Sequence, residues 1–342
     1  MRLGQYAAAA LLVGGVFLAG GCAEAEPVAS GAHPPVRLSA WQSYWDASSG
    51  AQEYDKIKKK LTALSCFAVY YDASDAFLVP DEVRDMAKQR LARGTARYLT
   101  FTNDIGGTNK KEKDIALLRR LLKDDDARVE QAEKMAALAK ELKMDGVELD
   151  FEGFVKDADL RAAYLSFTYQ LIRVCANERL KLRIVLEPSF PFDMALAKGP
   201  EYVVMFYNLY GRHSGPGPKA DRAFIEKTIG KMEAIPGDKA AAFATGGCLW
   251  EDYGLLGLKS GTRRFVTEAE AVQLAKKHKV SPARDASGAM HYTFKDGGHE
   301  TEVWYADAET LNAWITLAAN HGIASVNIWR LGSNDRIERV EP

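Results

Sequence analysis

Three carboxylates lie at alternate positions in one short segment, residues 146–152 (GVELDFE). Side chains two positions apart on a strand share a face at a spacing of about 6.5–7 Å, so Glu148, Asp150 and Glu152 would project together. Carboxylates crowded on one face resist ionising together, because each charge disfavours the next. Such crowding suits a site that needs a protonated acid beside an ionised carboxylate. The pattern therefore predicts acid–base chemistry on this segment.

The other face of the same segment is apolar. Val147, Leu149 and Phe151 alternate with the carboxylates. Side chains with this alternation point away from the carboxylates, where they would pack against a helix. The segment is therefore expected to be a strand with its acids turned away from the helices.

The rest of the chain alternates between strand-like and helix-like patterns. The expected strands are 36–44, 64–71, 97–103, 146–152, 182–187, 202–207, 240–245 and 324–329. The expected helices are 110–122, 128–142, 160–178, 219–233 and 309–320. About eight repeats of strand then helix predict an α/β fold with a parallel sheet, and the number favours a (β/α)8 TIM barrel. The alternative is an open doubly wound sheet, although no GxGxxG follows an early strand.

A longer stretch, about 250–306, separates the seventh expected strand from the eighth. Thr267 and Glu270 have the spacing of a capping box, which would begin a helix that extends through Lys277. Two extended runs follow, joined by a turn typical of a hairpin: 289–294, 300–305 and the turn Asp296-Gly297-Gly298. We expect a small α+β insertion on the rim of the barrel. It either forms one wall of a substrate cleft or only stabilises the fold.

The amino terminus has the pattern of a secretory signal. Arg2 precedes an apolar run over 6–18, and the small residues 19–21 precede Cys22. Small residues before a cysteine resemble the bacterial lipobox, with Ala19 where leucine is usual and Leu18 one place further from the cysteine. A lipid on Cys22 would attach the protein to a membrane surface without spanning it.

These features divide the chain into three parts. We expect a signal peptide of the lipoprotein type over 1–21, a tether over 22–35 and a folded barrel domain over 36–342. The expected location is outside the cytoplasm, lipid-anchored to the bacterial cell envelope and facing the periplasm or the exterior.

Composition and charge exclude other classes. The 342 residues include 45 basic and 46 acidic ones, and no basic block extends beyond Lys58-Lys59-Lys60, so nucleic acid is not an expected partner. Cys66, Cys175 and Cys248 lie in apolar contexts and are read as buried small side chains rather than disulfides. None of the six histidines is near the carboxylate segment, so no zinc site and no cofactor are expected.

The segment 145–152 (DGVELDFE) resembles the DxxDxDxE signature of glycoside hydrolase family 18, the chitinases and their relatives, which act on N-acetylglucosamine polymers. Asp145, Asp150 and Glu152 match its first acid, last aspartate and terminal glutamate, and Glu148 replaces its middle aspartate. With the helix–hairpin insertion, other segments are similar to the spore-germination branch, whose members cleave peptidoglycan or its cortex form: 205–208 (MFYN), 215–218 (GPGP), 302–307 (EVWYAD) and 326–332 (VNIWRLG). The resemblance extends from about Leu38 to the end.

The resemblance implies substrate-assisted, retaining catalysis, in which the 2-acetamido oxygen of the sugar is the nucleophile. Glu152 would be the general acid and base. Asp150 would orient the acetamido N–H and stabilise the positive intermediate, and Tyr207 would donate a hydrogen bond near the acetamido oxygen. All three residues would then be catalytic.

The resemblance also implies substrate-binding residues. Trp329 would form an apolar floor under the sugar, Met205 would face it, and Asp145 and Glu148 would lie deeper, with Glu148 sharing a proton with the acid above it. Four residues at expected strand ends are either further sugar contacts or loop packing: Tyr71, Asn103, Trp250 and Glu251.

The leading interpretation is an exported hydrolase of β-linked N-acetylglucosamine glycans, either peptidoglycan or chitin-like. One alternative is a catalytically inactive barrel at the cell surface that binds carbohydrate. Another is a metal-dependent hydrolase, because clustered carboxylates can also hold Mg²⁺ or Ca²⁺.

Overall fold

The computed structural model describes residues 26–28, 31–107, 110–251 and 261–342. The predicted signal peptide and Cys22 lie outside these described residues. Within the described ranges, no helix combines the length and the apolar character needed to cross a membrane.

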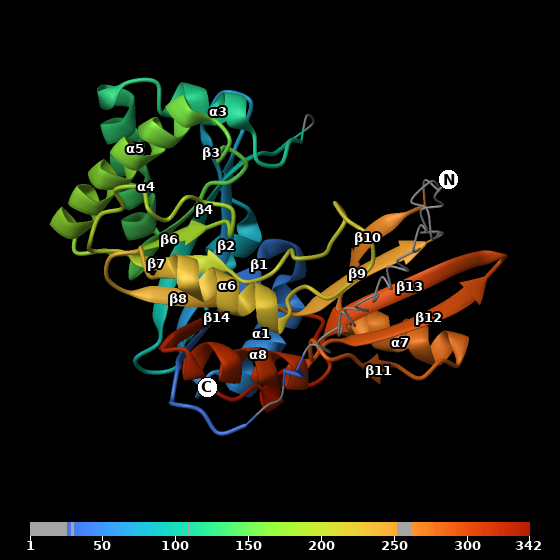
Figure 1. Ribbon diagram of the computed structural model, residues 1–342. Helices are drawn as coiled ribbons and strands as arrows, with labels where there is room; N and C mark the ends of the chain where they lie inside the picture. The colour runs from blue at the N-terminus through green and yellow to red at the C-terminus, as the bar shows by residue number, and fades with distance from the viewer. Residues whose placement is uncertain (1–25, 29–30, 108–109, 252–260) are drawn as a thin grey trace, which may run out of the picture.

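Eight parallel strands close into a barrel (Figure 1). They run in the order β1-β14-β8-β7-β6-β5-β4-β2, and β1 pairs with β2 to complete the ring. This closure confirms the predicted (β/α)8 barrel over the open sheet, and every expected strand overlaps one of these. The strands are β1 (Arg37–Ser43), β2 (Leu61–Tyr71), β4 (Ala96–Ile105), β5 (Gly146–Asp150), β6 (Lys181–Leu186), β7 (Glu201–Met205), β8 (Lys239–Ala244) and β14 (Ser325–Leu331), with β3 (Phe77–Leu78) antiparallel to β2.

The helices of the barrel lie outside the ring of strands (Figure 1). They are α1 (Ala47–Ile57), α2 (Asp81–Lys88), α3 (Ile115–Leu121), α4 (Asp125–Glu141), α5 (Ala158–Asn177), α6 (Arg222–Met232) and α8 (Ala308–Asn320), with short 3-10 turns at Tyr44–Asp46 and Ile337–Arg339. Five begin at an aspartate whose carboxylate accepts a backbone N–H three residues on, which satisfies a donor that the helix leaves free: Asp114, Asp124, Asp157, Asp221 and Asp307.

The sequence patterns did not predict α1 and α2. The first turns of α1 contain Ser48, Ser49 and Gly50, which are weak helix formers. The helix forms because it buries Tyr54 and Ile57 against the barrel, so tertiary packing overrides local propensity.

Apolar packing forms two separate layers in the barrel. The larger layer fills the space between strands and helices, and Val147, Leu149 and Phe151 belong to it, as predicted. A smaller cluster fills the inside of the barrel, where three alanines of β8 (240, 242 and 244) face Trp41 and Met205. The carboxylates of β5 therefore point into the barrel and toward its mouth.

The insertion leaves the barrel at the carboxyl end of β8 and forms a five-stranded antiparallel sheet, in the order β10-β9-β13-β12-β11, with one helix (Figure 1). Its elements are β9 (Gly246–Glu251), β10 (Arg263–Val266), α7 (Glu268–His278), β11 (Ala283–Arg284), β12 (Met290–Asp296) and β13 (His299–Ala306). It begins at Gly246, slightly before the expected start. Gly247 allows β9 to approach β13, because a Cβ there would lie 1.8 Å from the Trp304 carbonyl oxygen.

The local signals of the insertion are largely confirmed. The hairpin turns through Gly297 and Gly298, both with positive φ, and Asp296 pairs with His299. Thr267 caps α7 by accepting the N–H of Glu270 at 3.2 Å. The predicted capping box is only half formed, because the Glu270 carboxylate instead pairs with Arg264 at 2.6 Å.

Candidate active site

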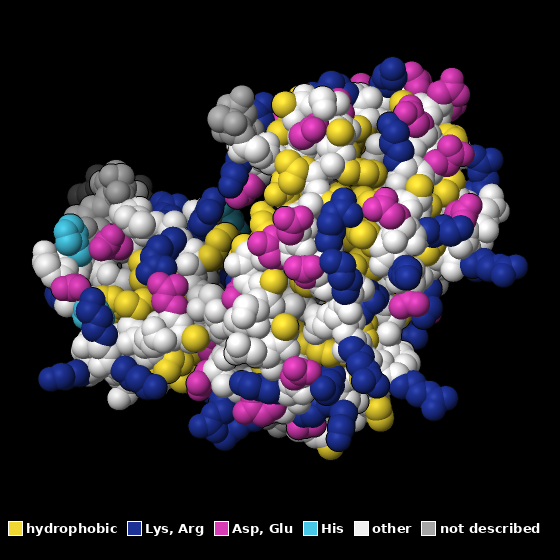
Figure 2. All heavy atoms as spheres, turned by 180° about the vertical axis from the view of Figure 1, so that it is seen from behind, with side chains coloured by type: hydrophobic (Ala, Val, Ile, Leu, Met, Phe, Trp, Pro, Cys, Tyr) yellow, Lys and Arg dark blue, Asp and Glu magenta, His cyan; other side chains and the backbone are white. Residues whose placement is uncertain are grey.

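A cavity of about 740 Å³ lies at the carboxyl ends of the barrel strands. Figure 2 shows the hollow between the barrel and the insertion. One side of the cavity belongs to the insertion, and we call the residues there the insertion wall: Gly247, Phe265, Val266, Thr267 and Glu270. Of the two roles expected for the insertion, the structure supports that of a cleft wall.

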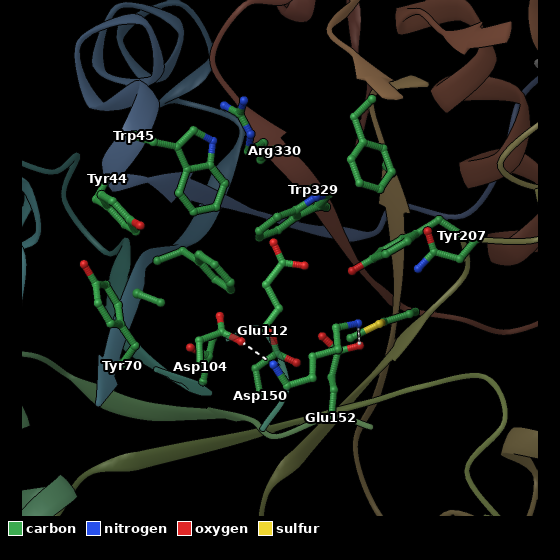
Figure 3. Close-up of a pocket in the computed structure, with 18 of the residues that line it drawn as sticks. Tyr44, Trp45, Tyr70, Asp104, Glu112, Asp150, Glu152, Tyr207, Trp329 and Arg330 are labelled. Atoms are coloured by element: carbon green, nitrogen blue, oxygen red, sulfur yellow. Dashed lines mark hydrogen bonds and ion pairs between the residues drawn. The ribbon is translucent and has the colours of Figure 1, made fainter. Parts of the chain in front are cut away.

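Asp150 and Glu152 lie at the floor of this cavity (Figure 3). Asp150 ends β5 and is buried, and the Glu152 side chain is 14% exposed. The Asn103 amide fixes the backbone of Glu152, accepting its N–H at 2.8 Å and donating to its carbonyl at 3.0 Å. Gly153 then turns the chain away with a φ of +83°. Strand β4 thus holds Glu152, which follows β5. The Asn103 side chain was expected to contact sugar, but its amide oxygen and nitrogen bond the backbone of Glu152 instead.

The two carboxyl groups differ in their affinity for a proton. Burial raises the pKa of Asp150 well above its usual value, and the charges of Glu152 and Glu148 raise it further. Asp150 Oδ1 has no hydrogen-bond partner. Burial also raises the pKa of Glu152, but Lys113 opposes that shift. In the free protein we therefore assign the proton of this coupled pair to Asp150, the reverse of the expectation that Asp150 is the ionised member.

Lys113 is a site residue that the sequence did not reveal. Its Nζ lies 2.6 Å from Glu152 Oε2. It belongs to the loop between β4 and α3, has a φ of +53°, and donates its backbone N–H to Asp104 at 2.7 Å. This region was expected to be helical from Lys110, but Asp114 caps α3 and leaves 110–113 as a loop over the cavity. No spacing pattern indicates a contact made across such a loop.

Replacing Lys113 with methionine is expected to raise the pKa of Glu152. The ammonium favours the ionised carboxylate, so its removal favours the protonated form. A ¹³C carboxyl titration of the free protein measures this directly, and the basic limb of a kcat/KM profile would move to higher pH. Lys111→Met is the matched control, because Lys111 lies in the same loop and pairs with Asp114 at 3.3 Å. An unchanged Glu152 titration in Lys113→Met would contradict this assignment.

Glu148 is a structural residue rather than the expected substrate contact. Its side chain is fully buried in the barrel, where it accepts hydrogen bonds from the Trp41 indole, from Ser65 at 2.8 Å and from Thr100 at 2.7 Å. Arg183 is 4.0 Å away. No hydrogen bond joins the two described side chains of Glu148 and Asp150, so the expected proton sharing is replaced by a charge effect. The arm of Glu148, longer than that of aspartate, takes its carboxylate to β1, β2 and β4.

Glu148→Ala is expected to lower the free energy of unfolding by about 3–5 kcal/mol. The change leaves three buried donors without their acceptor and removes the more distant of two carboxylates near the buried Arg183, which also pairs with Glu201 at 2.6 Å. Urea denaturation measures the loss. Glu130→Ala, on an exposed face of α4, is the control and should leave the urea midpoint nearly unchanged. Equal stability of the two variants would show that the buried network contributes nothing.

Tyr207, Met205 and Trp329 line the cavity as expected. In Figure 3 the phenol of Tyr207 points toward the side of the cavity that holds Asp150 and Glu152. Trp329 lies across the view from these two carboxylates. Burial and the nearby acids raise the pKa of Tyr207 well above its usual value, so its phenol is a neutral donor. Phe67 holds the Trp329 ring edge to face at 4.6 Å between centroids.

Other candidate contacts lie away from the cavity lining. Asp145 lies at the amino end of β5, exposed at the mouth opposite to the cavity, where it accepts the Arg97 N–H at 2.7 Å. Trp250 is 1% exposed, donates to the Ser214 carbonyl at 3.0 Å, and packs inside the protein rather than lining the cavity. Glu251, at the end of β9, is likewise away from the lining.

Tyr71 faces outward, where its hydroxyl accepts a hydrogen bond from Gln131. Its neighbour Tyr70 lines the cavity instead, because adjacent strand residues face opposite sides. Tyr44, Trp45 and Phe67 also line it and were not predicted.

The remaining cysteines and acids give no sign of other chemistry in the described ranges. Cys66, Cys175 and Cys248 are buried and free, as expected. Among the described residues, no three His, Cys, Asp or Glu side chains are grouped as a metal site would require.

The comparison with known families fits this geometry. The family model described as glycosyl hydrolases family 18 matches residues 41–335. The chain belongs to this family. The matched range includes the whole DxxDxDxE-like segment, so the family predicted from that segment is confirmed.

Individual relatives of this family 18 chain are more distant. An uncharacterized glycosylase, YvbX, from Bacillus subtilis is 26% identical over 234 residues, which cover 64% of this chain and 66% of that protein. The spore cortex-lytic enzyme SleL from Bacillus cereus has a TM-score of 0.74 and 20% identity, covering 90% of this chain and 74% of that one. A chitinase from Chromobacterium violaceum has a TM-score of 0.73 and 15% identity, with coverage of 89% and 96%. These solved structures show a shared fold.

Proposed function

We propose that this protein is a glycosidase that cleaves β-linked N-acetylglucosamine glycans, peptidoglycan or chitin-like. The observation that carries the proposal is the buried pair of Asp150 and Glu152, with its separated proton affinities, at the floor of a large cavity. Similar solved structures support this substrate class. One is a spore cortex-lytic enzyme, and another is a class V chitinase from Nicotiana tobaccum in complex with NAG4.

The proposed reaction is substrate-assisted and retaining. Glu152 gives its proton to the glycosidic oxygen as the bond to the anomeric carbon breaks, and the acetamido carbonyl oxygen forms a new bond to that carbon. Asp150 accepts the acetamido N–H, and Tyr207 donates to the acetamido oxygen region. Water then attacks the anomeric carbon, the bond from that carbon to the acetamido oxygen breaks, and the water gives a proton to Glu152. This step restores the acid and releases the sugar with its original configuration.

Lys113 adds a requirement to this cycle. In the free protein its ammonium pairs with Glu152 and favours the ionised carboxylate, while Asp150 holds the proton. The reactive arrangement needs the proton on Glu152. We therefore assign to the entering sugar the task of separating Lys113 from Glu152, so that the proton of the pair is redistributed before the bond breaks.

Mass spectrometry of fragments tests the proposal. Purified peptidoglycan and N-acetylglucosamine oligomers are incubated with the protein, and new reducing ends are identified. Release from either substrate supports a glycosidase, and the fragment masses assign the bond cleaved. Binding without release from both would instead identify an inactive carbohydrate-binding barrel, and release that stops with EDTA would favour the metal-dependent alternative.

We also propose that the protein is exported and anchored through a lipid on Cys22, facing the periplasm or the exterior. The support is the apolar run and small residues that precede this cysteine. In cells fed a radiolabelled fatty acid, the parent is expected to carry label and to sediment with membranes, and Cys22→Ala is expected to lose both. Equal labelling and sedimentation of the two would refute the anchor.

A further inference from the structure

Two basic side chains line the cavity beside the insertion wall without a carboxylate partner. They are Lys219, which is 7% exposed, and Arg212, which is exposed at the rim. Within the described ranges, neither forms an ion pair. Three other cations of the lining are neutralised, since Lys113 pairs with Glu152, Lys111 with Asp114 and Arg330 with Asp46. Figure 2 shows basic side chains around the hollow.

Both cations are packed against the same aromatic ring. Lys219 Nζ lies 4.6 Å from the centroid of Phe265, and the guanidinium carbon of Arg212 lies 5.3 Å from it. The remaining partner of the ammonium is the Cys248 thiol, and burial lowers the pKa of Lys219. A buried cation without an anion is costly, so an arriving anion would be stabilised here. Phe265 is 56% exposed and stands at the rim rather than in a core.

The loop that carries the two cations, between β7 and α6, is held by several contacts. Leu209 donates its N–H to the Lys219 carbonyl at 3.1 Å, which closes the loop at its base. The Trp250 indole anchors its middle at Ser214. Gly217 lies so close to the Tyr210 ring that a Cβ would be 2.5 Å from it. The backbone that carries Arg212 and Lys219 is therefore held in place by contacts within the protein.

The acid on the insertion wall does not cancel this charge. Glu270 pairs with Arg264 at 2.6 Å, so its carboxylate is already satisfied. A site that offers two cations and an aromatic edge fits a planar carboxylate attached to a sugar, because guanidinium and ammonium groups donate charge-assisted hydrogen bonds to it.

We propose that Arg212 and Lys219 bind a carboxylate carried by the glycan, so that the cavity prefers amino-sugar polymers with acidic substituents over neutral N-acetylglucosamine polymers. The inference rests on the proposed function, because it takes the cavity as the glycan site. Peptidoglycan fits this class, since muramic acid carries a lactyl carboxylate where no stem peptide is attached, and the stem peptides themselves carry carboxylates. Chitin carries none.

Binding in a Glu152→Gln background tests the inference without dependence on turnover. Calorimetry compares three soluble probes of equal length: a neutral N-acetylglucosamine oligomer, a muramic-acid-containing peptidoglycan oligomer, and the latter after its carboxylates are converted to amides. Arg212→Gln and Lys219→Met are each expected to weaken binding of the acidic probe about tenfold, the scale of one hydrogen bond between charged groups. Binding of the neutral and amidated probes should change less than about twofold.

Matched variants separate a local effect from misfolding. Lys276→Gln removes an exposed cation of α7 that does not line the cavity, and it should leave all three affinities unchanged. Circular dichroism checks the fold of Lys219→Met, and Arg212→Gln, at an exposed position, provides the test if the buried variant unfolds. Equal weakening for the acidic and amidated probes, or no weakening, overturns the inference. Failure of every probe to bind would instead overturn the proposed function and, with it, this inference.

Discussion

Replacing Glu152 with glutamine is expected to lower kcat on peptidoglycan and on N-acetylglucosamine oligomers by about 100- to 10,000-fold. Glutamine preserves the size of the side chain but has no proton to give to the leaving oxygen, and general acid catalysis contributes an effect of this size. The backbone contacts of residue 152 with Asn103 do not involve the side chain, so the fold should persist. Release of reducing ends measures the loss.

Glu112→Gln is the control for this variant. Glu112 lines the same cavity from the loop between β4 and α3, and the substitution is chemically the same. Its activity is expected to stay within about threefold of the parent, well short of the effect of general acid catalysis. If Glu152→Gln and the parent release sugar equally, Glu152 is not the acid.

Asp150→Asn is expected to lower kcat by about 100- to 1,000-fold, the scale of losing one preorganised polar group in an active site. The amide carries no negative charge to stabilise a positive oxazolinium ion, and it cannot hold the proton that we assign to Asp150. The measurement uses two substrates, a natural oligomer and an aryl chitobioside whose phenolate leaves without protonation.

The aryl substrate separates the roles of the two acids. Glu152→Gln should recover much of its first-step rate on it, because no proton is needed, whereas Asp150→Asn should remain impaired. Equal recovery by both variants would show that Asp150 does not act on the acetamido group. Tyr164→Phe is a control, since its buried hydroxyl makes no hydrogen bond within the described structure.

The alternation in residues 146–152 was enough to predict which side chains face the inside of the barrel. Its period of two separates the acids from Val147, Leu149 and Phe151, and the closed barrel keeps that separation. The same pattern did not predict how far along the barrel each acid lies. Asp145 precedes β5, so it emerges at the wrong mouth, and Glu148 lies too deep to meet a sugar.

Residues brought in by loops could not be predicted in this way. Lys113 reaches Glu152 across 39 positions of sequence, from a left-handed backbone conformation that no periodicity signals. Arg212 and Lys219 form a common site only when Phe265 of the insertion packs against both of them. Local patterns specify elements and faces, whereas these contacts depend on how separate elements dock.

The insertion has an apolar core of its own, built from residues such as Leu249, Val266, Tyr292 and Val303, separate from the two clusters of the barrel. Because the two cores do not share side chains, substitutions in the sheet can reshape one side of the cavity while leaving the strand that carries the acids untouched. The shape of one cavity wall and the placement of the acids are then encoded in different units of the same chain. Changes confined to the insertion could therefore alter the shape of the cavity without disturbing Asp150 and Glu152.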